Sequence, residues 1–144
     1  MNRRTLGDAA LRVALAGTVA VSGYIHAQLY VTGYRYIHVV GVMFLMQAAV
    51  SFALAALLLV GGPALLRLGA AGAAAGALAG FAASRSVGVF GFTERGLQPS
   101  PQSLISILAE SATLLLLAPT LVRLLRTVRT ARTAHTLRAA RVSR

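Results

Sequence analysis

The sequence has 144 residues, of which 57% are hydrophobic and 12% are charged, and its mean hydropathy is +0.74. Soluble domains are usually about 45–50% apolar and about 25% charged, so this composition predicts a chain that folds in lipid. The net charge is +11 and no cysteine is present. The lack of cysteine excludes disulfides, thiolate metal sites and the chemistry of four-helix membrane thiol oxidoreductases.

The first apolar stretch runs from about residue 9 to 30 and follows a pair of arginines. A cleaved signal peptide is the alternative interpretation, because it also begins with basic residues. The apolar run is longer than a usual signal-peptide core, and His26 and Tyr30 stand near its end, where small residues would mark a cleavage site. We therefore predict an uncleaved membrane-spanning helix.

Three further apolar stretches follow in the chain, at about residues 36–60, 64–92 and 103–122. Gly61-Gly62-Pro63 is a strong turn signal between two of them, and the polar segment 93–101 precedes the last. Each stretch is long enough to cross about 30 Å of hydrocarbon at 1.5 Å per residue. We expect one all-α transmembrane domain over residues 1–144, an integral membrane four-helix bundle with up-down-up-down connectivity.

The arginines predict which side of the membrane each end occupies. Eleven of the 14 lie at the N-terminal end, in the second loop or in the C-terminal tail, whereas Arg35 and Arg95 lie on the opposite side. Positively charged loops stay in the cytoplasm, so we expect both ends there. The absence of lysine and the bias toward Ala, Gly, Arg, Leu and Val favour a GC-rich bacterial genome, and hence a multi-pass protein of the bacterial inner membrane.

Small residues recur every four positions along the third predicted helix, at Gly72, Gly76, Gly80, Ser84 and Gly88. Such a stripe lets two helix backbones approach closely. The partner is either another helix of the bundle or a second copy of the chain.

Polar side chains inside the predicted spans are unfavourable in hydrocarbon, so they usually pair with another polar group or belong to a functional site. Helical rise places four of them, one from each helix, in the outer half of the bilayer: His26, His38, Arg85 and Glu110. Tyr30 lies beside His26 near the outer end of the first helix, and Gln47 lies deeper on the second. We take these six residues as a candidate polar pocket.

We expect Arg85 and Glu110 to form an ion pair, because a guanidinium and a carboxylate can bond bidentately and cancel their charges. This pair either fixes only the register of the bundle or belongs to a functional pocket. In the functional case Glu110 would exchange a proton for a substrate or an ion. The small multidrug transporters do this, but they carry their glutamate on the first helix and rely on tryptophan, which this chain lacks.

No cofactor is predicted from these residues. Haem or a metal ion at His26 and His38 is the alternative, with Arg85 beside haem propionates or Glu110 as a further metal ligand. The chain has no phosphate-binding loop, no Ser–His–acid constellation and only three acidic residues, so we assign no catalytic residue and do not predict an enzyme.

The C-terminal tail, residues 123–144, carries arginine at nearly every third position. On an α-helix this spacing spreads the charges around the rod. We expect binding to anionic lipid headgroups through Arg123, Arg126, Arg129 and Arg132. An acidic protein partner is the alternative, and the lack of an aromatic platform argues against nucleic acid.

The chain contains several short motifs: Gly23-Tyr24-Ile25-His26, Leu29-Tyr30, Gly33-Tyr34-Arg35-Tyr36-Ile37, Gly41, Phe44-Leu45-Met46-Gln47-Ala48 and Val87-Gly88-Val89-Phe90-Gly91-Phe92. Together they resemble motifs of uncharacterised four-helix integral membrane proteins of actinobacteria. The resemblance covers about residues 20 to 115 and implies a four-helix topology with a histidine–tyrosine patch near the outer surface. DoxX-like proteins are similar in architecture only, which implies no function.

Two function classes remain open from the sequence. In the first, the chain is a structural or accessory membrane protein. In the second, it binds or transports an ion, a cofactor or a small lipophilic ligand through the His/Arg/Glu pocket.

Overall fold

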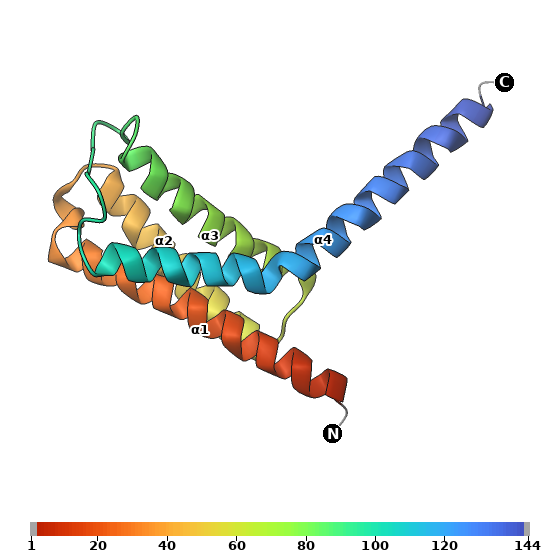
Figure 1. Ribbon diagram of the computed structural model, residues 1–144, viewed down its shortest axis with the longest axis horizontal. Helices are drawn as coiled ribbons and strands as arrows, with labels where there is room; N and C mark the ends of the chain where they lie inside the picture. The colour runs from red at the N-terminus through yellow and green to blue at the C-terminus, as the bar shows by residue number, and fades with distance from the viewer. Residues whose placement is uncertain (1–2, 143–144) are drawn as a thin grey trace.

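The computed structural model describes the backbone of residues 3–142 and the side chains of residues 5–127 and 129–130. Its elements are four α-helices and a short 3₁₀ helix: α1 (Arg3–Thr32), η1 (Tyr34–Tyr36), α2 (Val40–Val60), α3 (Ala64–Ser84) and α4 (Gln102–Val142). Consecutive helices run antiparallel, and α4 continues past the bundle as a long rod (Figure 1). The described chain contains no strand, only an isolated bridge between Val89 and Phe92. The prediction of four helices and an all-α fold is confirmed.

The third helix is shorter than predicted, because it ends at Ser84 and not near residue 92. Gly88 and Gly91 have φ angles of +82° and +80°, which fall in the left-handed region that L residues avoid. The apolar run therefore continues past the helix as a turn. The second helix also begins later than predicted, at Val40, because η1 and a turn take up the residues before it.

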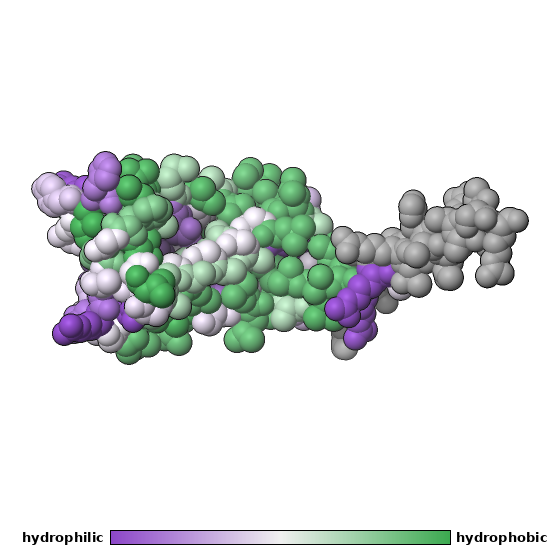
Figure 2. Space-filling view, turned by 90° about the horizontal axis from the view of Figure 1, so that it is seen from above, coloured by the Kyte–Doolittle hydropathy of each residue, from purple (hydrophilic) through white to green (hydrophobic). Residues whose placement is uncertain are grey.

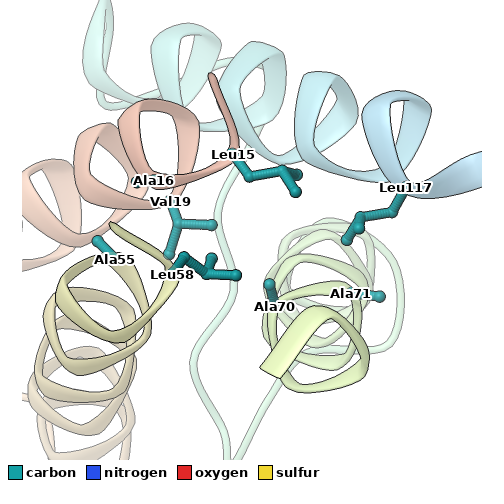
Figure 3. Packing of buried hydrophobic residues seen from close by; sticks show 8 residues of the cluster. All are labelled: Leu15, Ala16, Val19, Ala55, Leu58, Ala70, Ala71 and Leu117. Carbon is teal, nitrogen blue, oxygen red and sulfur yellow. The ribbon is translucent and has the colours of Figure 1, made fainter. Parts of the chain in front are cut away.

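All four helices pack together at the end of the bundle that carries the chain termini (Figures 1 and 3). Leu15, Leu58 and Leu117 are fully buried in this cluster. Alanines at positions such as Ala55, Ala70 and Ala71 let the backbones lie close around these three leucines. This end is the close-packed half of the molecule.

The closest glycine contact between two α-helices lies at Gly23 on α1. A Cβ added there would meet Cβ of Ser51 on α2 at 2.9 Å, so a side chain at this position does not fit. By contrast, Cβ atoms added to Gly72, Gly76 and Gly80 would meet nothing within 4 Å. Of the two partners left open for the α3 stripe, another helix of the bundle therefore makes no close contact at these three positions.

The other two members of that stripe differ from each other, and only Gly88 departs from the predicted helix. Ser84 is buried in the last turn of α3, and Gly88 lies beyond the helix in the connection to α4. In the tail, Arg123, Arg126 and Arg129 are exposed on α4 beyond the core cluster, and the side chain of Arg132 lies outside the described residues.

We predict opposite effects for two glycine-to-alanine changes. Gly23→Ala should destabilise the protein by about 1–3 kcal/mol through overpacking against α2. Gly76→Ala should be neutral or stabilising by up to about 1 kcal/mol, because alanine favours the helix and the added methyl meets open space. Circular dichroism during unfolding in mild detergent measures the change in stability of both variants. Equal effects would contradict the close approach at Gly23.

Candidate functional site

A cavity of about 510 Å³ lies between α2 and α3, in the half of the bundle away from the termini. Its walls are mainly apolar and include Met43, Phe44, Met46 and Val50 from α2 and the small residues of α3. Residues from all four helices and from the connections line it. The polar ones are His26, Gln47, Ser84, Arg85, Glu94, Ser103, Ser106 and Glu110.

The cavity exists because α2 and α3 separate as they leave the core cluster. They still touch at Gly69, where an added Cβ would lie 3.3 Å from Cδ2 of Leu54. Further along, Nε2 of Gln47 donates a hydrogen bond of 3.2 Å to the carbonyl oxygen of Ala73. The glycines at 72, 76 and 80 therefore leave an open wall and do not bring two helices together.

Glu110 on α4 places a carboxylate at the side of the cavity formed by α1 and α4. It is 2% exposed, and its Oε1 accepts hydrogen bonds from Oγ of Ser106 at 2.7 Å and from Oγ of Ser22 at 3.1 Å. No described residue donates a hydrogen bond to Oε2, and no described basic side chain lies within 4.0 Å of the carboxylate. Two neutral hydroxyls thus hold a buried acid that lacks a cation.

Arg85 does not pair with Glu110, so that prediction is wrong. Its Nη2 instead lies 2.8 Å from Oε2 of Glu94, with both side chains mostly buried. The guanidinium also donates to the carbonyl oxygens of Gly96 and Gln98 and lies 3.6 Å from the ring centroid of Phe81. Arg85 follows the last residue of α3 and ties the connection to α4 over the end of the cavity.

Tyr34 of η1 also lines the end of the cavity that Arg85 and Glu94 cover. Its hydroxyl donates to Oε1 of Glu94, and its ring stacks on Phe44 with centroids 4.3 Å apart. Burial, followed by the hydrogen bond to Glu94, raises the pKa of Tyr34 above its ordinary value of about 10. Neither Tyr34 nor Glu94 is among the six residues predicted from the sequence to form the pocket. The sequence did contain a signal for Glu94, because it is one of only three acidic residues available to pair with an arginine and lies in a polar loop beside Arg95.

His26 faces the cavity from α1, where its ring lies 5.1 Å from that of Phe44. Its Nδ1 lies 2.9 Å from the carbonyl oxygen of Ser22. A carbonyl only accepts, so Nδ1 carries the proton, and Nε2 of the neutral ring is an acceptor. Tyr30 and His38 do not line the cavity, and His38 is exposed in the turn before α2.

Four of the six predicted pocket residues therefore line one cavity: His26, Gln47, Arg85 and Glu110. The haem or metal alternative needed His26 and His38 together, and the cavity contains only the first. Within the described chain, no group of three or more His, Cys, Asp or Glu side chains is placed to hold a metal ion.

Comparisons with protein-family models, curated sequences and solved structures find no match for this chain. The resemblance to actinobacterial membrane proteins stays a prediction and contributes no functional residue.

We predict that a double-mutant cycle between Arg85 and Glu94 gives a coupling of about 1–3 kcal/mol, because removing either partner leaves a mostly buried charge unpaired. The free energy of unfolding in detergent would be measured for wild type, Arg85→Gln, Glu94→Gln and the double variant. The same cycle between Arg85 and Glu110 should give a coupling near zero. A large coupling in the second cycle would contradict the observed pairing.

The raised pKa of Tyr34 predicts a loss of stability at high pH. The unfolded chain releases the phenolic proton near pH 10, whereas the folded chain retains it to higher pH, so unfolding is favoured as pH rises above about 10. Tyr34→Phe should flatten this dependence relative to wild type in thermal melts between pH 8 and 11. An unchanged pH dependence would contradict a buried phenol beside Glu94.

Proposed function

We propose that this chain is an integral membrane protein that binds a small amphipathic molecule in the cavity between α2 and α3. Four helices are long and apolar enough to cross a membrane: Thr5–Thr32, Val40–Val60, Ala64–Ser84 and Gln102–Thr127. The face seen in Figure 2 has hydrophilic residues at the two ends of the bundle and an apolar band between them. A band of this kind suits the hydrocarbon of a bilayer.

The proposed orientation follows from the arginines. The end with the chain termini also carries Arg12, Arg67 and the tail arginines, and this excess of positive charge favours the cytoplasm. The cavity then opens in the outer half of a bacterial inner membrane. Exposed arginines such as Arg123 and Arg126 would lie among the anionic headgroups of the inner leaflet.

The observation that carries the binding proposal is the buried carboxylate of Glu110 in an apolar cavity. An uncompensated acid in a membrane interior is costly, so a merely structural residue at this position would be expected to have a cation beside it. Here Oε2 accepts no hydrogen bond from a described residue. The cavity has mainly apolar walls, and its volume suits a small ligand.

The chemistry of the cavity defines the class of ligand. Glu110 offers an acceptor, and Nε2 of His26 offers a second. A ligand that fits would have an apolar body, placed against Phe44 and the α3 glycines, and one amine or hydroxyl group that donates to Glu110. Because the wall between α2 and α3 is built from small residues, such a molecule would enter from the lipid.

We predict that the purified protein binds N-phenyl-1-naphthylamine, a fluorescent apolar probe with one N–H donor, more tightly than 1-phenylnaphthalene, which lacks the donor. Gly76→Leu should abolish binding by filling the cavity. Glu110→Gln should weaken binding of the amine by about tenfold or more, as expected for a hydrogen bond to a charged group, and leave the hydrocarbon unaffected.

Gly17→Leu is the matched control, because Gly17 is also an open position within a helix but does not line the cavity. It should bind both probes like wild type. Failure of wild type to bind either probe, or equal loss in Gly17→Leu and Gly76→Leu, would overturn the proposal.

An accessory role is the second candidate, and one observation favours it. Gly72 and Gly76 are exposed, so a helix of a partner or of a second copy could pack on this wall. In that case Gly76→Leu would change the oligomeric state measured by light scattering in detergent, whereas ligand binding predicts an unchanged state.

A further inference from the structure

Two arginines from different helices meet at the opposite end of the bundle, beside the connection between α2 and α3. A Cβ added to Gly62 in that connection would lie 3.1 Å from Cδ of Arg12 on α1 and 3.3 Å from Nη2 of Arg67 on α3. The two side chains therefore flank the same glycine, and the missing side chain at Gly62 leaves them room. Both residues are half-buried.

Neither guanidinium has an anionic partner among the described residues. Glu94 pairs with Arg85 at the other end of the bundle. Asp8, one turn before Arg12 on α1, is exposed and makes no ion pair with it within 4.0 Å. Moreover, Nε of Arg67 is buried without any hydrogen-bond partner. A buried N–H group that lacks an acceptor costs free energy, so this position calls for an acceptor from outside the chain.

We infer that Arg12 and Arg67 form a binding site for a phosphate group. A guanidinium donates through a planar fork that matches the oxygens of a phosphate, and two guanidiniums on different helices can hold one anion between them. Arg67 belongs to the first turn of α3, where the helix dipole also favours negative charge. The site lies away from the cavity, so it does not depend on the proposed cavity ligand, whereas a lipid as the source of the phosphate rests on the proposed membrane location.

The surroundings favour a phosphate carried on a lipid. Leu11 and Leu66, next to the two arginines in sequence, pack on the core cluster, and Leu65 is 77% exposed on the first turn of α3. An apolar surface therefore adjoins the cationic pair, as an acyl chain would require. Basic pockets between membrane helices bind anionic headgroups in the same manner.

Binding of short-chain phosphatidylglycerol to the full chain in detergent tests this site, with a diacylglycerol of the same chain length and inorganic phosphate as comparison ligands. We expect phosphatidylglycerol to bind and diacylglycerol not to bind. Arg12→Gln and Arg67→Gln should each weaken binding by about tenfold, the loss expected for a charge-assisted hydrogen bond. Arg12→Lys and Arg67→Lys should weaken it less, because lysine keeps the charge.

Arg95→Gln is the matched control for charge alone, since Arg95 is exposed in the loop at the other end of the bundle. It should change binding less than twofold, because salt screens the interaction of a distant exposed charge with the ligand. Competition by inorganic phosphate would support the site and assign it to free phosphate as well as lipid. Unchanged binding in both glutamine variants would overturn the inference. So would an equal loss in Arg95→Gln, or a loss seen only when Arg123 and Arg126 are replaced.

Discussion

The buried cluster around Leu15, Leu58 and Leu117 joins all four helices at one level of the bundle, and the rest of the structure depends on it. Alanines surround the three leucines and let the backbones come close. In the membrane that we propose for this chain, the hydrophobic effect does not drive helices together, so packing of this kind would supply the association energy. Beyond the cluster, α2 and α3 are free to separate, and the cavity is the result.

Polar contacts hold the open half of the bundle together. The hydroxyl of Ser22 on α1 reaches Glu110 on α4, and Gln47 on α2 reaches the backbone of α3. At the end of the cavity, the Arg85–Glu94 ion pair and Tyr34 join the last connection to η1. Such bonds are directional and leave space between the helices. They combine stability with an internal surface that a second molecule can contact.

The division of charge between the two ends gives each a different chemistry. At the cavity, Glu110 is an acid without a cation. At the end that carries the chain termini, Arg12 and Arg67 are cations without an acid among the described residues. With only three acidic residues in the chain, few acids are available to pair with the two arginines. We propose that both positions are completed by partners from outside, a hydrogen-bond donor at Glu110 and a phosphate at Arg12 and Arg67.

The sequence was sufficient to predict four helices, because each apolar run matches the length of a span. It also predicted that His26, Gln47 and Glu110 share one region, since depth follows from helical rise. The pairing of Arg85 failed for a specific reason. The third helix was assumed to continue to residue 92, which put Arg85 two turns inside the bundle.

Hydropathy cannot report the left-handed turns at Gly88 and Gly91 that end this helix early and leave Arg85 at its end, beside Glu94. Glycine spacing was equally ambiguous. The same residue type forms a close contact at Gly23 and an open wall at Gly76. Only the packing of the neighbouring helix distinguishes the two positions.

The central claim is that Gly76 lines a cavity that water can reach and does not face only lipid, and the reactivity of a thiol at this position tests it most directly. The chain has no cysteine, so Gly76→Cys and Leu115→Cys each introduce a single thiol, the second on a leucine of α4 that is 74% exposed. The account predicts that a water-soluble methanethiosulfonate reagent modifies the thiol at 76 about tenfold faster in membranes, because thiolates form only where water reaches. Equal, slow modification at both positions would contradict a cavity between α2 and α3 that water can reach.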